Sequence, residues 1–304
     1  MNCSRMNAYP LISIVTPSYN QAEYLEKTIL SVLSQNYPNL EYIIVDGGST
    51  DKSVEIIKKY EKFLKYWVTE SDQGQTNALN KGFKHATGDL LTWLNSDDYY
   101  MPGALHKVAG TAMAKPQAHV FVGTGQIIDQ MGNVLHYKEP PPEIGRELLY
   151  NWLRGGHFMQ PSCFFRQSAW ELAGPIDEDL HMAFDLDLWL RMAKKGCKFV
   201  GIPELLSTAL SHESAKTTAF EDFMVVDVAI VVLRHGGEDA AVRGRLEDMA
   251  RRLSWCEANL KKIKNNPLFK ILSPMIKIFF KPAVRWQETT PPWSNNHTGS
   301  SVTK

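Results

Sequence analysis

Short apolar runs alternate with amphipathic stretches over the first hundred residues of the chain. Four mostly apolar runs have the length and composition of buried strands, at 11–15, 42–45, 66–69 and 90–94. The stretches between them place apolar residues at helical spacing, as in the helix expected over 23–35 with Asn20 as its cap. This alternation predicts an α/β fold with a mostly parallel central sheet covered by helices.

The remaining two thirds of the chain continue with less regular elements. Strands are expected at 119–124, 126–137 with a hairpin turn at 131–133, 160–165, 198–202 and 205–210. Helices are expected at 102–115, 143–153, 168–173, 183–195 and 220–264. A further helical stretch follows Pro267, and residues 288–304 have the composition of a disordered tail.

Acidic residues follow three of the four predicted N-terminal strands. They are Asp46, Asp72 and the adjacent pair Asp97 and Asp98. Ligands of open α/β sheets bind beyond the carboxyl ends of the strands, so these acids are expected along one ligand-binding edge. Adjacent carboxylates favour a divalent cation, because hard oxygen ligands suit Mg²⁺ or Mn²⁺. The alternative for the pair taken alone is a solvated loop that caps the next helix.

Composition narrows the class of protein. The 304 residues carry zero net charge, which argues against broad nucleic-acid binding. The four cysteines lack metal-ligand spacing and are expected to be free thiols in a reducing compartment. No signal peptide is evident, and the longest apolar run, 223–233, is too short to span a bilayer. We therefore expect a cytoplasmic protein, with peripheral association at the inner face of the cell membrane left open.

Five motifs follow one another along the first two thirds of the chain. They are Thr16-Pro17-Ser18-Tyr19-Asn20, Val45-Asp46-Gly47-Gly48-Ser49-Thr50-Asp51, Asp72-Gln73-Gly74 with Asn77-Ala78-Leu79-Asn80-Lys81-Gly82, Asn95-Ser96-Asp97-Asp98, and Asp185-Leu186-Asp187-Leu188-Trp189-Leu190-Arg191. In order and spacing they resemble glycosyltransferase family 2, whose members have the GT-A fold. The resemblance implies a GT-A catalytic domain over 1–218, with a nucleotide half at about 10–100 and an acceptor half at about 101–218. A helical, basic extension over 219–287 and the tail would follow.

The resemblance also implies roles for individual residues. Asp46 resembles the acid that bonds the base, usually uracil, Asp98 the direct metal ligand, and Asp185 the catalytic base. Phe184 stands where the family often has glutamate. Apart from Asp46, the residues that would line the nucleotide pocket are Thr16, Pro17, Tyr19, Asn20, Gly47, Asp72, Lys81 and Asp97.

Several of these residues also have ordinary interpretations. Asp185, without the upstream motifs, would be an acid favoured by the dipole at a helix N-terminus. His212 is either a second metal or diphosphate ligand or a solvated loop residue. His157 and Gln160 line the acceptor side or belong to a plain loop, and Trp189 is an acceptor platform or a core residue.

The activity expected from the resemblance is metal-dependent inverting transfer in surface polysaccharide biosynthesis. The donor would be a nucleotide-sugar, expected to be a UDP-sugar, and the acceptor a saccharide or a lipid-linked molecule. A nucleotidyltransferase is one alternative, but it would need a glycine-rich basic loop where Pro17 and Tyr19 stand. A non-catalytic nucleotide- or carbohydrate-binding module is the other.

The segment 261–285 combines basic residues with apolar residues at helical spacing. Such a segment suits an anionic membrane surface, because lysine and arginine are attracted to its lipids. The alternative is a helix that packs back on the catalytic domain with its lysines in water.

Overall fold

The computed structural model describes residues 9–155, 157–212, 215 and 221–265. The chain divides into two units, Met1–Asp248 and Met249–Lys304. The strands are β1 (Ile12–Ser18), β2 (Leu40–Asp46), β3 (Tyr66–Thr69), β4 (Leu90–Trp93), β5 (Tyr99–Tyr100), β6 (Val120–Ile128), β7 (Val134–Lys138), β8 (Cys163–Arg166) and β9 (Phe199–Leu210). The α-helices are α1 (Ala22–Leu33), α2 (Ser53–Tyr60), α3 (Gln75–Phe83), α4 (Ala104–Ala114), α5 (Arg146–Tyr150), α6 (Gln167–Ala173), α7 (Phe184–Lys194), α9 (Glu221–Arg234) and α10 (Glu238–Asn265). Three short 3-10 helices are η1 (Glu61–Phe63), η2 (Trp152–Arg154) and η3 (Gln160–Ser162).

One sheet runs through the first unit, in the order β3-β2-β1-β4-β8-β6-β9-β5, with β7 paired to β6. The four N-terminal strands are parallel to one another, as the alternation of strands and helices predicts. Beyond them β8 is antiparallel to both β4 and β6, while β6 and β9 are parallel. The sheet is therefore parallel in its first half and mixed in its second.

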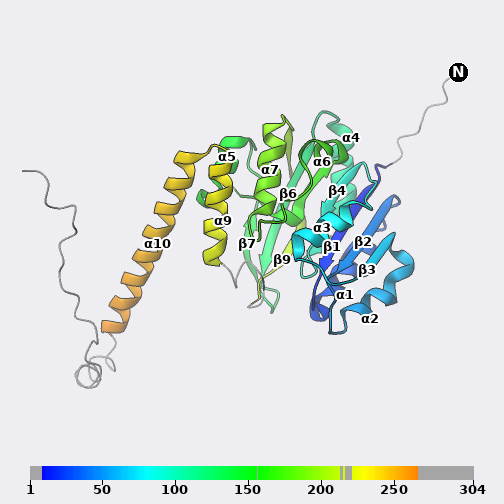
Figure 1. Cartoon of the computed structure of the whole chain (residues 1–304), viewed down its shortest axis with the longest axis horizontal. Helices are drawn as coiled ribbons and strands as arrows, with labels where there is room; N and C mark the ends of the chain where they lie inside the picture. Colours follow the sequence, from blue (N-terminus) through cyan, green and yellow to red (C-terminus); the bar gives the residue numbers. More distant parts are fainter. Residues whose placement is uncertain (1–8, 156, 213–214, 216–220, 266–304) are drawn as a thin grey trace, which may run out of the picture. The chain divides into compact units, whose positions relative to one another are not determined.

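Two apolar cores lie on the two faces of this sheet. Successive residues of a strand point to opposite faces, so Ile14 of β1 joins one core and Val15 the other. The core that contains Ile14 includes α1, α2 and α4, and the core that contains Val15 includes α3, α6, α7 and α9. Figure 1 shows α3, α6 and α7 together in front of the sheet.

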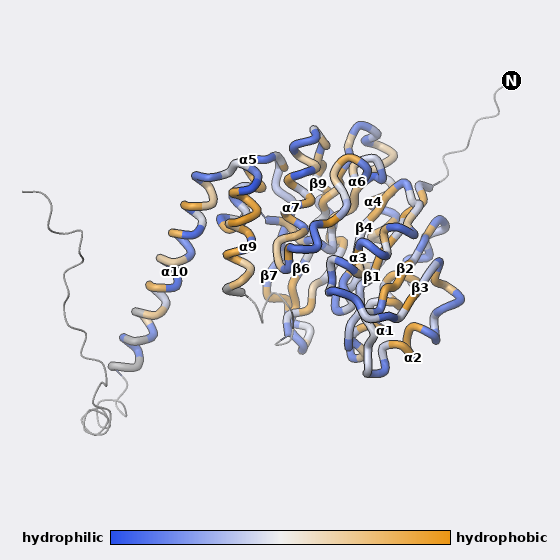
Figure 2. Tube along the Cα trace, in the orientation of Figure 1, coloured by the Kyte–Doolittle hydropathy of each residue, from blue (hydrophilic) through white to orange (hydrophobic). Residues whose placement is uncertain are grey.

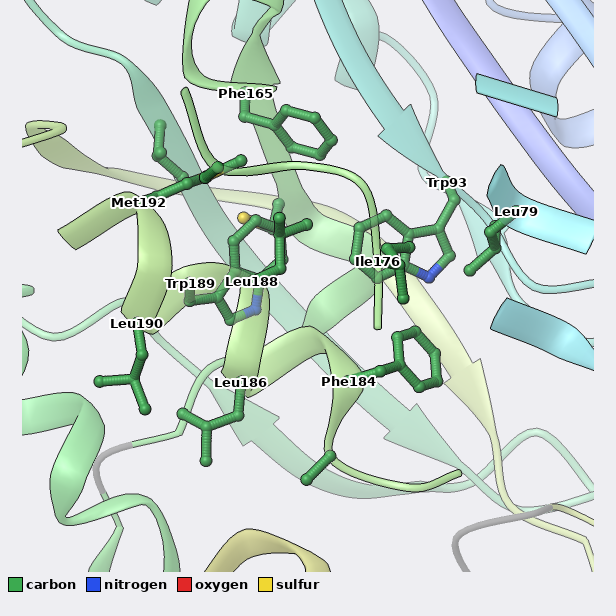
Figure 3. Packing of buried hydrophobic residues seen from close by; sticks show 14 of the residues in the cluster. Leu79, Trp93, Phe165, Ile176, Phe184, Leu186, Leu188, Trp189, Leu190 and Met192 are labelled. Atoms are coloured by element: carbon green, nitrogen blue, oxygen red, sulfur yellow. The ribbon is translucent and has the colours of Figure 1, made fainter. Parts of the chain in front are cut away.

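The core beneath α7 is built on aromatic rings. Trp93 at the end of β4 stacks on Trp189 of α7, with ring centroids 5.6 Å apart and an angle of 12° between the planes. Phe165 and Phe184 pack around this pair (Figure 3). Both tryptophans are fully buried. Of the two expectations for Trp189, the structure supports the core residue, because a ring inside the core offers no face to a sugar.

Two of the expected strand pairs form single long strands. Residues 120–128 form the one strand β6 across both expected strands, and β9 continues through Pro203. The pairing of β6 with β9 shifts register on both sides of Thr124, and the Thr124 hydroxyl donates to the Pro203 carbonyl oxygen at 2.8 Å. A bulge tolerates proline because it takes that residue out of the ladder of hydrogen bonds.

Some helix boundaries also differ from expectation. The helix expected at 143–153 is only α5 followed by η2, and the first residues of the strand expected at 160–165 form η3. The helix expected over 220–264 is two helices, because Gly236 adopts a positive φ of 85° between α9 and α10. The valine-rich face of α9 lies in the same core as α7, so the first unit continues to Asp248.

Most of the segment 261–285 and the whole tail at 288–304 lie outside the described residues. The proposed membrane surface of that segment therefore stays a prediction. Within the described part of the chain, every helix is too short or too polar to cross a bilayer.

Candidate active site

The carboxyl ends of β1, β2 and β3 meet at one edge of the sheet. Ser18 pairs with Asp46, and Asp46 pairs with Thr69, so the three strands end side by side. The end of β4 adjoins β1 through the pairing of Val15 with Trp93. Residues that follow these strands therefore gather along the edge where ligands of α/β sheets bind.

Asp46 ends β2 and has no exposed surface. Its carboxylate accepts hydrogen bonds from the backbone N–H groups of Gly48 at 3.2 Å and Ser49 at 2.9 Å. It also accepts from the hydroxyl groups of Ser49 at 2.5 Å and Thr69 at 2.7 Å. The carboxylate therefore supports the loop after β2, and the expected contact between Asp46 and a base stays a prediction.

The end of β1 is likewise internal. The Thr16 hydroxyl lies 3.1 Å from the hydroxyl of Tyr42, and both residues are buried. Pro17 is buried beside it, whereas Tyr19 is 61% exposed. In the motif after β1, Tyr19 and Asn20 are therefore exposed, while Thr16 and Pro17 are buried, and their expected places in the nucleotide pocket stay predictions.

Asn20 fastens the loop after β1 to the loop after β2. Its φ is 52°, and its side-chain oxygen accepts the N–H of Thr50 at 2.9 Å. The first turn of α1 is satisfied from the neighbouring loop, because Asp51 accepts the N–H of Ala22 at 2.9 Å. The expected cap of α1 by Asn20 is thus wrong, since Gln21 occupies that position without a side-chain hydrogen bond.

Asp72 lies on the outer side of the same loop and is partly exposed. Its Oδ1 accepts the N–H of Gly74 at 2.8 Å. A Cβ atom at Gly47 would stand 2.8 Å from Oδ2 of Asp72, so this carboxylate rests directly on the Gly47 backbone. Asp72 and Gly47 therefore form an accessible acidic surface where Asp46 forms a buried support.

Asp97 and His212 meet although they are far apart in the sequence. The antiparallel pairing of Tyr99 with Thr208 brings the residues before β5 next to those after β9. His212 Nε2 lies 3.1 Å from Oδ2 of Asp97. The His212 ring also packs on Tyr24, with ring centroids 4.6 Å apart. This contact forms a site with one carboxylate and one imidazole at the edge of the sheet.

Asp98, the second acid of the pair, is buried. Its carboxylate accepts hydrogen bonds from Asn95 Nδ2 at 3.1 Å and from the backbone N–H of Leu210. Burial raises the pKa of Asp98 well above its usual range, and the negative charge of Asp97 raises it further. Asp97 is the acid of the pair that reaches His212 and keeps exposed surface, and the role of Asp98 as direct metal ligand stays a prediction.

Asp185 is mounted in the first turn of α7. The preceding residue, Phe184, packs on Trp93 at the end of β4, with ring centroids 6.1 Å apart (Figure 3). Burial raises the pKa of the Cys163 thiol, and the negative charge of Asp185 nearby contributes. Because Trp93 ends β4 and Cys163 begins β8, these neighbours place Asp185 close to the ligand-binding edge.

The model of glycosyl transferase family 2 matches residues 13–172. The chain belongs to glycosyltransferase family 2. A candidate teichuronic acid biosynthesis glycosyltransferase of Bacillus subtilis (strain 168), TuaG, is 33% identical over 207 residues, which cover 66% of this chain and 79% of that protein. The protein is therefore a glycosyltransferase, as the five sequence motifs predict.

Two solved structures share the fold of this glycosyltransferase. S. aureus TarS 1–349 in complex with UDP-GlcNAc has a TM-score of 0.56 at 18% identity, and the match covers 86% of this chain and 77% of that chain. The Pyrobaculum calidifontis mannosyltransferase PcManGT in complex with GDP-Man and Mn²⁺ has a TM-score of 0.57 at 17% identity, covering 88% of this chain and 84% of that chain. The glycosyltransferase therefore has the GT-A fold, which confirms the predicted fold class.

Three further predicted site residues of this glycosyltransferase, Lys81, Gln160 and His157, contact other residues of the protein. Lys81 of α3 forms an ion pair with Glu70 at 2.7 Å. Gln160 donates from Nε2 to the carbonyl oxygen of Trp93 at 2.9 Å, which places it at the end of β4. His157 is exposed, and its Nδ1 lies 3.3 Å from the carbonyl oxygen of Trp152. Gln160 thus belongs to the ligand-binding edge, and roles for His157 and Lys81 stay predictions.

A connection between α3 and the loop before α7 was not predicted from the sequence. Asn80 donates from Nδ2 to the carbonyl oxygen of Ile176 at 2.9 Å and accepts the N–H of Ile176 at 3.0 Å. Glu178 accepts from Asn77 at 2.8 Å, and the hydrogen bonds from Asn80 and Asn77 lower the pKa of Glu178. The spacing of Asn77 and Asn80 was the available signal, but the sequence does not show their partners a hundred residues later.

Proposed function

We propose that this glycosyltransferase moves a sugar from a UDP-sugar to a saccharide or lipid-linked acceptor in polysaccharide biosynthesis, with inversion at the anomeric carbon. Two comparisons support the donor and the pathway class: the TarS complex contains UDP-GlcNAc, and TuaG is a candidate teichuronic acid glycosyltransferase. Family membership favours this activity over nucleotidyl transfer and over a non-catalytic binding module.

The nucleotide would bind at the ends of β1 and β2. The accessible carboxylate of Asp72 is suited to accept a hydrogen bond from an N–H group of uracil, and it rests against the Gly47 backbone. The exposed ring of Tyr19 would flank the base or ribose. Asp46 and Asn20 hold the two loops in place through their internal hydrogen bonds. The pocket would thus be formed before the donor arrives.

Asp97 and His212 are the residues proposed to hold a divalent ion. Their contact at 3.1 Å places a carboxylate oxygen and an imidazole nitrogen within reach of one ion, and both ligand types suit Mn²⁺. The described residues contain no cluster of three or more such ligands, so the diphosphate and water would complete the coordination. The bound ion would neutralise negative charge on the leaving diphosphate. The presence of Mn²⁺ in the PcManGT complex supports this assignment.

Asp185 is the proposed base. A carboxylate in the first turn of a helix is stabilised by the positive end of the helix dipole, which keeps it ready to accept a proton. It would take the proton of the acceptor hydroxyl as that oxygen attacks the anomeric carbon. Because a single base supports a single displacement, the sugar would be transferred with inversion.

The observation that most supports this proposal is the contact between Asp97 and His212. It connects the end of β4 with the end of β9, at the edge of the sheet where Asp72 also lies. The test is a panel of UDP- and GDP-sugars with Mn²⁺, comparing the wild type with Asp185→Asn. Asp179→Asn serves as the control, because Asp179 is an exposed acid in the loop before α7. Transfer from a UDP-sugar should fall by about 10²-fold or more in Asp185→Asn and stay unchanged in the control. Turnover with GDP-sugars alone, or full activity of Asp185→Asn, would overturn the proposal.

A further inference from the structure

An apolar row runs along α10, which is one continuous helix from Glu238 to Asn265. Its members are separated alternately by four and three residues. The described row is Val242, Leu246, Met249, Leu253 and Cys256. In Figure 2, hydrophobic segments of α10 recur between hydrophilic ones. In the sequence, Leu260 and Ile263 continue the same spacing.

The row is exposed although its residues are apolar. Val242, Leu246, Met249 and Leu253 are 55%, 60%, 55% and 62% exposed, and Cys256 is exposed as well. Ala241 and Asp248, in the part of α10 that belongs to the first unit, are buried and lie on another face of the helix. The row is therefore distinct from the buried face of α10.

We propose that the row is the seam of a parallel two-stranded coiled coil formed by two copies of this chain. Alternating steps of four and three residues average 3.5, the repeat that keeps one seam facing a partner helix along its whole length. In this register Leu246, Leu253 and Leu260 occupy the a positions. Val242, Met249, Cys256 and Ile263 occupy the d positions.

The charges that flank the seam favour the parallel arrangement. In a parallel pair, each g residue faces the e residue five positions later on the second copy. Glu238 then faces Arg243, and Arg245 faces the neutral Ala250. Neither of these pairs brings like charges together, so a second copy in register is electrostatically compatible there.

The width of the row favours a second copy of α10 over a membrane surface as its partner. A helix that lies on a bilayer presents a broad apolar face, whereas a row confined to a and d positions is the narrower seam of a coiled coil. Beside the row, the b positions carry Glu247 and Ser254, and Trp255 at a c position is the exposed apolar exception. The narrow seam therefore fits a second α10 better than it fits lipid.

The first test is the mass of the full chain in solution, measured by sedimentation velocity over a range of concentrations. The wild type should approach twice the monomer mass of 34.4 kDa. Leu253→Glu places a charge in the seam and should give a monomer, whereas Ser254→Glu adds the same charge on the adjacent outer position and should stay dimeric. Both side chains are exposed, so both variants should remain folded, as judged by circular dichroism.

The second test uses Cys256 as a reporter of orientation, in a Cys3→Ser background because Cys3 lies outside the described residues. Copper phenanthroline would remove two electrons and two protons from a pair of Cys256 thiols and join them in a disulfide. A covalent dimer should form, and it should be absent in Cys256→Ser and when the cysteine is moved by Ala258→Cys in that variant. Cys163 and Cys197 are buried and should not react.

A monomeric wild type would overturn the proposal, as would a dimer that Leu253→Glu leaves intact. A dimer without the Cys256 cross-link would contradict the parallel arrangement. If the wild type is monomeric but binds anionic vesicles and Leu253→Glu does not, the row is a membrane surface instead.

Discussion

Replacing Asp46 by asparagine should weaken the fold, because this buried carboxylate accepts four hydrogen bonds around the loop after β2. Asparagine can keep its oxygen at the Oδ2 position, which accepts three of the four bonds, and then places its amide NH2 group where Oδ1 accepted from Ser49. A hydrogen bond to a charged group contributes about 1.5–3 kcal/mol, so the loss of this one bond should cost about that amount. For a unit of this size, the melting temperature should fall by roughly 3–12 °C.

Asp72→Asn is the matched comparison at the same edge. Asp72 is partly exposed, and asparagine can still accept the N–H of Gly74, so its melting temperature should stay within about 2 °C of the wild type. Its affinity for UDP should nevertheless fall, because asparagine lacks the charge that strengthens the hydrogen bond to the base. Thermal unfolding followed by circular dichroism and titration calorimetry with UDP measure the two effects separately.

The two variants distinguish a residue that stabilises the loop after β2 from a residue that contacts the nucleotide. If Asp46→Asn melts like the wild type and yet fails to bind UDP, Asp46 contacts the nucleotide and the structural assignment is refuted. If Asp72→Asn is destabilised as much as Asp46→Asn, then Asp72 is a structural residue and the proposed contact with the base fails.

Two further substitutions test neighbouring features. Gly47→Ala would place a Cβ 2.8 Å from Oδ2 of Asp72 and should weaken UDP binding by about tenfold or more, which calorimetry can measure; unchanged affinity would show that the Asp72 carboxylate is not part of the pocket. Asp187 accepts from Arg191 at 2.7 Å and from His235 at 2.8 Å, so Asp187→Asn should cost about 3–5 kcal/mol at neutral pH in urea unfolding. Burial alone would raise the pKa of Asp187, but the His235 hydrogen bond and the Arg191 charge lower it below its ordinary value. The stabilisation is therefore complete above the unfolded pKa of about 4 and is lost as the pH falls through the lower folded pKa, so the two stability curves should converge there; a pH-independent gap would contradict this explanation.

The parallel half of the fold could be predicted because each of its elements has a local pattern. The apolar runs that end near Val15, Val45, Thr69 and Leu94 correspond to β1–β4 within a few residues. The second half was harder, since Pro203 and Gly125 normally interrupt strands. Here a bulge fixed by Thr124 lets β6 and β9 continue, and such a bulge depends on contacts between residues distant in sequence.

The location of the candidate site could be predicted, but the role of each acid in it could not. Because acidic residues follow three of the predicted strands, the sequence indicated that they lie along one edge of the sheet. Whether Asp46 or Asp72 is accessible depends on Thr69 and on the loop after β2. Similarly, Asp97 and Asp98 are adjacent, and only the pairing of β5 with β9 decides which of them meets His212.

Titration calorimetry of UDP in Mn²⁺ and in EDTA tests most directly whether Asp97 and His212 hold a metal ion for a UDP-sugar. It compares the wild type, Asp97→Asn and the exposed control Asp179→Asn. Wild type and control should bind UDP at least about tenfold more tightly in Mn²⁺, and Asp97→Asn should lose that difference. Equal affinity of the wild type in Mn²⁺ and EDTA, or a full Mn²⁺ effect in Asp97→Asn, would contradict the account.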